Sequence, residues 1–154
     1  MATPDANLLV RTWLLTPFLA IDGEGVTNPV LDLIGPDRVW AGALPEGFDP
    51  GAGPGITVVR GGSGMTSGGR PNPEIPDLVS AHVQIRVWAE LNEFQVANTI
   101  YLAIREWMHA RNNIVFEDIG YLMQSVEVVE GMDVRDPETG FATVICFFDL
   151  LLHN

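Results

Sequence analysis

Apolar and polar residues along the chain recur at two spacings, one typical of helices and one typical of strands. From about Asp5 to Thr16, apolar side chains fall on or near one side at helical spacing, which predicts a helix that Pro17 ends or kinks. Its apolar face comprises Leu8, Leu9, Thr12, Trp13 and Leu15. A second, short helix is predicted after Asn28, because a capping Asn, Pro29 and a later Gly35 have the usual order of helix signals.

The clearest strand is predicted near residue 85, where apolar and polar residues alternate strictly and therefore occupy opposite faces. The apolar set is Val83, Ile85 and Val87, and the polar set is His82, Gln84 and Arg86. The next segment, Asn92 to Gln95, is similar to a capping box and predicts a long helix that runs to about Arg111. The apolar stripe of this helix is Val96, Ile100, Ala103, Ile104, Trp107 and Met108.

The C-terminal third has the pattern of a β-hairpin. Residues 121–130 and 141–152 are strand-like, and the turn composition of residues 136–140 separates them. The last strand is apolar on both faces, with Ala142, Val144, Cys146, Phe148, Leu150 and Leu152 on one and Phe141, Ile145, Phe147 and Leu151 on the other. The expectation is that a neighbouring subunit covers the second face, because the chain has few helices to do so.

Most glycines and prolines lie between the short helix and the central strand, in a loop region at about 44–76. Between Gly35 and Pro76 there are only two short apolar pieces, at 39–43 and 56–59, and these are predicted to be short strands. The run from Arg60 to Arg70 is expected to be a flexible loop. It is not a phosphate-binding loop, because it has no Lys and leads into prolines instead of a helix.

Composition narrows the classes of function. The chain has 154 residues, 47% of them hydrophobic, which fits one folded domain over residues 1–154. Its formal charge is −12, with 20 acids against 8 basic residues, all of them Arg, and this charge disfavours net attraction to nucleic acid. No apolar stretch reaches the roughly 20 residues of a membrane span, and the N-terminus does not have the pattern of a signal peptide.

Residues with catalytic or metal-binding chemistry are present but do not form a known pattern. Cys146 lies in an apolar strand and is expected to be a small buried thiol. The three histidines, His82, His109 and His153, have no ligand-type residue at metal-binding spacing. Asp133, Asp136 and Glu138 lack the spacing of a calcium loop and fit a solvated turn. We therefore expect no enzymatic activity, no cofactor and no metal.

Three stretches have a characteristic order of strand, turn and helix. The first is RVWAGALP (38–45) followed by the short strand 56–60. The second is HVQIRVWA (82–89), which leads into the long helix. The third is 126–131, followed by DPETGF (136–141) and the terminal apolar strand. This order resembles the tail-terminator or tail-completion family of long-tailed bacteriophages, although residues 47–76 form a longer proline- and glycine-rich section than the family leads us to expect.

The resemblance implies an α+β fold in which a mostly antiparallel sheet packs against helices, with one long helix between the central strand and a C-terminal hairpin. It implies a structural virion protein at the head-proximal end of the tail, made in the host cytoplasm. Six copies would close into a ring on the tail tube, end its polymerisation and form the docking face for a head-completion or connector protein. DNA would pass through the negatively charged lumen without specific binding.

Three surfaces are candidates for contact with other subunits or partners. The polar face of the central strand carries His82, Gln84, Arg86 and Trp88, the glycine-rich loop carries Arg60, Met65 and Arg70, and the odd face of the last strand carries Phe141, Ile145, Phe147 and Leu151. The alternatives are a head-to-tail adaptor (neck) protein, a tail-tube subunit, a small enzyme or ligand-binding domain that uses the glycine-rich loop, and a host-directed or regulatory phage protein that binds another protein.

Overall fold

The computed structural model describes residues 5–21, 23–60, 66–67 and 78–153. The first helix, α1 (Ala6–Leu15), begins where the Asp5 carboxylate accepts hydrogen bonds from the backbone N–H groups of Asn7 and Leu8, and it ends at Thr16 before Pro17. The short helix is the 3₁₀-helix η1 (Pro29–Asp32), and Asn28 caps it by accepting from the Val30 N–H. Two further 3₁₀ turns are η2 (Pro36–Arg38) and η3 (Pro50–Ala52).

A seven-stranded sheet forms the centre of the fold, with strand order β3-β4-β6-β9-β8-β7, and β5 also pairs with β6. The strands are β3 (Val39–Ala41), β4 (Gly55–Arg60), β5 (Thr66–Ser67), β6 (Leu78–Ala89), β7 (Arg111–Phe116), β8 (Gly120–Arg135) and β9 (Ala142–His153). A separate two-stranded hairpin consists of β1 (Phe18–Ile21) and β2 (Glu24–Thr27).

The α+β class agrees with the prediction, and the mostly antiparallel sheet agrees in part. Pairings from β4 across to β7 are antiparallel, but β3 pairs with β4 in parallel, so the sheet is mixed. The predicted C-terminal hairpin is present as β8 and β9, with β8 longer than expected. The predicted short strands in the glycine- and proline-rich region correspond to β3 and β4.

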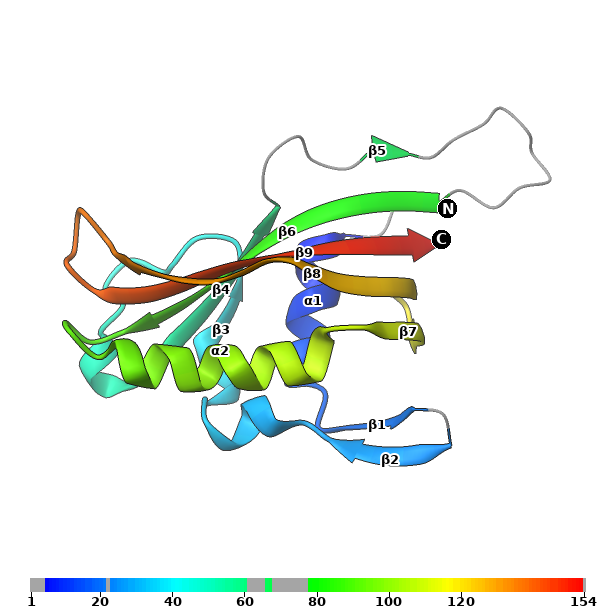
Figure 1. Cartoon of the computed structure of the whole chain (residues 1–154), viewed down its shortest axis with the longest axis horizontal. Helices are drawn as coiled ribbons and strands as arrows, with labels where there is room; N and C mark the ends of the chain where they lie inside the picture. The colour runs from blue at the N-terminus through cyan, green and yellow to red at the C-terminus, as the bar shows by residue number, and fades with distance from the viewer. Residues whose placement is uncertain (1–4, 22, 61–65, 68–77, 154) are drawn as a thin grey trace.

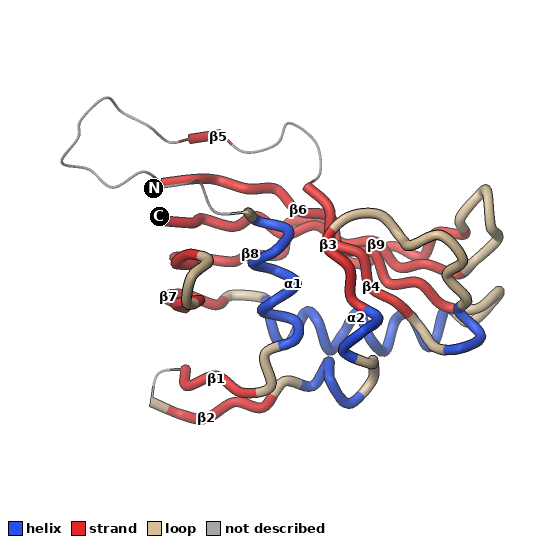
Figure 2. The backbone as a smooth tube through the Cα atoms, turned by 180° about the vertical axis from the view of Figure 1, so that it is seen from behind, coloured by secondary structure: helices blue, strands red, loops and turns tan. Residues whose placement is uncertain are grey.

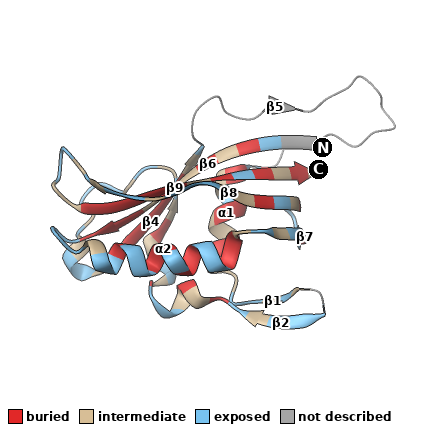
Figure 3. Cartoon of the chain, viewed as in Figure 1, coloured by how far each residue is buried: buried red, intermediate tan, exposed pale blue. Residues whose placement is uncertain are grey.

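Both α-helices pack on one face of the sheet, and the β1–β2 hairpin lies beyond them (Figure 1). The view from behind shows α1 and α2 on the same side of the strands (Figure 2). The main core lies between these layers, where the side of α2 that faces the sheet is buried and its opposite side is exposed (Figure 3). The indole N–H of Trp107 on α2 donates to the carbonyl of Trp13 on α1 at 2.9 Å, which joins the two helices inside this core.

The long helix α2 (Phe94–Met108) differs from its prediction at both ends. Asn92 has a positive φ of 65° and Glu93 occupies the cap position without a side-chain hydrogen bond, so the expected capping box does not form. The helix ends at Met108, and Arg111 already belongs to β7. Val96 is 40% exposed and lies off the buried stripe, which instead includes Ala97 and Tyr101.

Several elements of the fold had no prediction, among them the β1–β2 hairpin and β7. The β1–β2 hairpin follows α1, and β7 lies between α2 and the C-terminal hairpin, so the helix does not lead directly into the hairpin. Within the run from Arg60 to Arg70, which was predicted to be a flexible loop, Thr66–Ser67 form β5 and pair with β6, while Met65 and Arg70 lie outside the described residues.

Candidate subunit-contact face

Two of the candidate surfaces form one continuous face of the sheet. In the β6–β9 pairing, His82 lies opposite Asp149, Gln84 opposite Phe147, and Arg86 opposite Ile145. Residues directly opposite in paired strands point to the same side, so the polar face of β6 and the odd face of β9 coincide. We call this side the outer face, because α1 and α2 pack on the other side of the sheet.

One end of the outer face, near the β8–β9 turn, is already buried by the chain itself. Trp88, Thr143 and Ile145 are at most 8% exposed. The Trp88 indole N–H donates to the Thr57 hydroxyl at 3.0 Å, and the Arg86 guanidinium lies over the Trp88 ring. Trp88 and Ile145 are therefore internal, and the expectation that a neighbouring subunit covers the whole face does not apply to this end.

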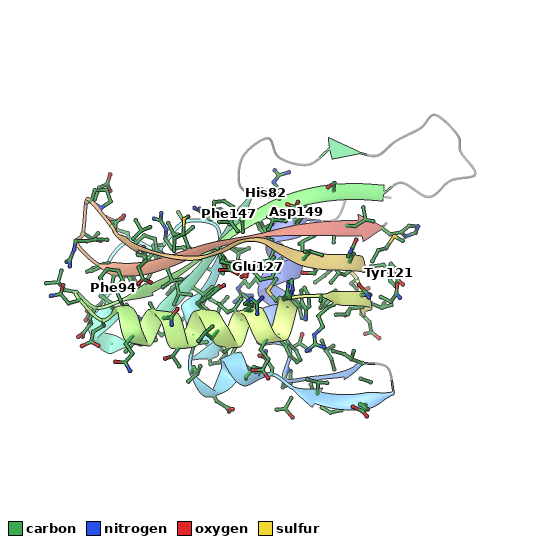
Figure 4. The ribbon with its side chains drawn as sticks, viewed as in Figure 1. His82, Phe94, Tyr121, Glu127, Phe147 and Asp149 are labelled. Carbon is green, nitrogen blue, oxygen red and sulfur yellow. The ribbon has the colours of Figure 1, made fainter. Side chains whose placement is uncertain are left out.

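The other end of the outer face is more open. The His82 ring stacks on Phe147 with centroids 5.1 Å apart, and its Nδ1 lies 2.5 Å from the exposed Asp149 carboxylate. Figure 4 shows these three side chains together on the side of the sheet away from α2. Gln84, Phe147 and Leu151 are half-buried. Beside them on β8 lie Val129 and Met132, which are 36% and 46% exposed.

The remaining candidates lie elsewhere. Arg60 lies opposite Val83 at the end of β4, which places it on the helix side of the sheet, although it is exposed. Phe141 immediately precedes β9 and packs edge-on against Phe48 of the 42–54 loop. Neither residue belongs to the open end of the outer face.

The β8–β9 turn is organised by Asp136. Its carboxylate accepts hydrogen bonds from the hydroxyl and the backbone N–H of Thr139, and Arg86 lies 3.8 Å away. The hydrogen bond from the Thr139 hydroxyl is the largest cause that lowers the pKa of Asp136 below its usual value of 3.8, and the Arg86 charge adds to it.

This lowered pKa predicts a pH dependence of stability. Because the folded protein holds the Asp136 proton less tightly than the unfolded chain, the ionised carboxylate stabilises the fold above pH 3.8, and this contribution is lost as pH falls through the lowered pKa. Asp136→Asn should lower the unfolding free energy by less than about 1 kcal/mol near neutral pH, and the difference should vanish in acid. Urea denaturation across this pH range measures it, with exposed Glu138→Gln as the control; a pH-independent difference would contradict the assignment.

A buried carboxylate on the helix side has no counterpart in the sequence predictions. The side chain of Glu127 on β8 is 2% exposed. Its two oxygens share the hydrogen bond that the Tyr101 hydroxyl donates, at 3.0 and 2.9 Å, and one of them accepts a second bond from Arg105 Nε at 3.0 Å. Its backbone N–H donates to His109 Nδ1. Burial, with Glu127 as a further cause, raises the pKa of Tyr101 to about 12. These contacts fasten α2 to β8, so we assign the cluster a structural role.

The described residues contain no reactive thiol, no metal cluster and no membrane-spanning helix. Cys146 is buried on the helix side, as predicted, and burial raises the pKa of its thiol. In the described part of the chain, no three His, Cys, Asp or Glu side chains are arranged to hold a metal ion. Among the described helices, none combines the length and apolarity that crossing a membrane requires.

Acidic and basic side chains differ in their surroundings: most carboxylates are exposed, whereas most arginines contact oxygens of the chain itself. Among the described residues, 15 of 17 Asp and Glu are exposed. Six of the seven described arginines instead contact oxygens of the chain itself. These six are Arg11, Arg38, Arg86, Arg105, Arg111 and Arg135. The exposed charged residues of the described chain are therefore mostly carboxylates.

Comparisons with known proteins identify a similar fold. No family model and no curated protein sequence matches the chain. The structure is similar to that of a chain in the virion of a native gene transfer agent (GTA) particle, with a TM-score of 0.59 and 14% identity, over 82% of this chain and 85% of that chain. At this identity the likeness shows the fold, which this chain shares with a component of that particle.

Proposed function

We propose that this chain is a non-enzymatic, structural virion protein of the phage type. The observation that carries this proposal is the shared fold with a chain of the gene transfer agent virion, which extends over most of both chains. The outer face supports it, because a sheet face with half-buried apolar side chains at one end is a surface that can bind another subunit.

Within this class we propose the tail terminator. Six copies form a ring on the tail tube, stop its polymerisation and present a docking face to the head-completion or connector protein. The surface charge is compatible with this position, since a lumen lined by carboxylates lets DNA pass without binding it. The protein would then be part of the virion, at the head-proximal end of the tail.

The test is to delete the gene for this chain from the phage or gene transfer agent genome that encodes it. We expect tails of uncontrolled length, or tails that fail to join heads, in negative-stain images. Complementation by the intact gene should restore normal particles. Tails of normal length that do not join heads would favour the head-to-tail adaptor, and the absence of tails would favour a tail-tube subunit. Normal, infectious particles without the protein would contradict a structural role.

The open end of the outer face is our candidate contact between copies. Phe147→Asp should dissociate the ring, because it places a carboxylate next to Asp149 and removes an apolar contact of the kind that contributes about 2 kcal/mol or more when it lies at the centre of an interface. Light scattering measures the change in mass, and circular dichroism checks the fold.

Two further variants separate loss of the subunit contact from loss of folding. Val129→Asp changes a more exposed residue opposite Phe147 on β8, and it should weaken the ring with less risk to folding. Leu102→Asp, at a 53% exposed site on α2, makes a similar exchange on the helix side and should leave the ring intact. An unchanged ring in both outer-face variants would show that this face is not the contact.

A further inference from the structure

We draw no further inference here: the strongest candidate, the pocket of about 330 Å³ between η3, the end of β6 and the start of α2, carries nothing, because it is a pair of exposed carboxylates, Glu90 and Glu93, beside the apolar side chains of Pro50, Pro54 and Val96, and nothing in the described part of the structure shows what covers it.

Discussion

Trp107→Ala is expected to lower the free energy of unfolding by about 3–5 kcal/mol, a large part of the stability of an ordinary domain. Trp107 is completely buried on α2, and its indole N–H donates to the carbonyl of Trp13 at 2.9 Å. The substitution leaves a large cavity and removes one of the two hydrogen bonds that the Trp13 carbonyl accepts, while the other, from the Thr16 N–H, remains. The cavity therefore accounts for most of the cost. Urea denaturation followed by circular dichroism measures the loss.

Trp40→Ala is the matched control, because Trp40 lies on the edge strand β3 and is half-buried. It removes the same side chain but much less buried contact, so its effect should be clearly smaller. Equal losses for the two variants would contradict the central position of Trp107 in the core.

Glu127→Ala is expected to destabilise the fold by about 1–3 kcal/mol, the cost of leaving a buried polar group without its hydrogen-bond partner. The Tyr101 hydroxyl loses its acceptor inside the fold, whereas Arg105 is 44% exposed and regains water. Glu130→Ala, three residues further along β8 at an exposed position, should change stability little.

A spectroscopic readout separates this interaction from a general loss of packing. Burial and Glu127 both raise the pKa of Tyr101 to about 12, so removing the carboxylate should move that pKa down toward its usual value of 10.0 without reaching it. Ultraviolet titration of the tyrosines follows the change. An unchanged Tyr101 pKa in folded Glu127→Ala would show that the carboxylate does not act on this hydroxyl in solution.

Strict periodicity explains which elements were predictable. β6 was assigned correctly because one side of the strand meets the helices, so apolar residues recur at every second position. β9 was assigned as a continuous apolar run after a turn, without such alternation. Helix α1 was predictable because the Asp5 cap and Pro17 mark its two ends in the sequence. In each case a local pattern coincides with a burial requirement imposed by the whole fold.

The missed elements are those in which the backbone interrupts the pattern. In β7, Asn113 has a positive φ of 57° and is skipped in the pairing with β8, so the strand lacks a regular alternation. In β8 the register shifts between Glu127 and Val129 move Val129 to the outer face while Glu127 faces the helix side. A periodicity argument cannot place a residue beyond such a shift, and for this reason the buried role of Glu127 was not predictable.

The candidate contact face was predictable only in part. The sequence indicates which residues of one strand share a face, but it does not indicate which strands are neighbours, because pairing joins distant segments. The meeting of His82 with Phe147 depends on the register between β6 and β9, which no local pattern contains. The burial of Trp88 likewise depends on Thr57 of the neighbouring strand β4 and on Arg86 of its own strand. Ile145 lies opposite Arg86, so its position also depends on the pairing of β6 with β9.

The internal use of the arginines has a consequence for the forces that can join copies of this chain. A cation held against carbonyls of its own chain is poorly placed to bridge to a neighbour, so approaching copies meet mainly carboxylate against carboxylate. At physiological ionic strength this repulsion is screened over about 8 Å, and dilution of salt extends it. Any attraction between copies would therefore come from short-range contacts between apolar side chains or backbone groups, and it would be strongest where dissolved ions screen the repulsion.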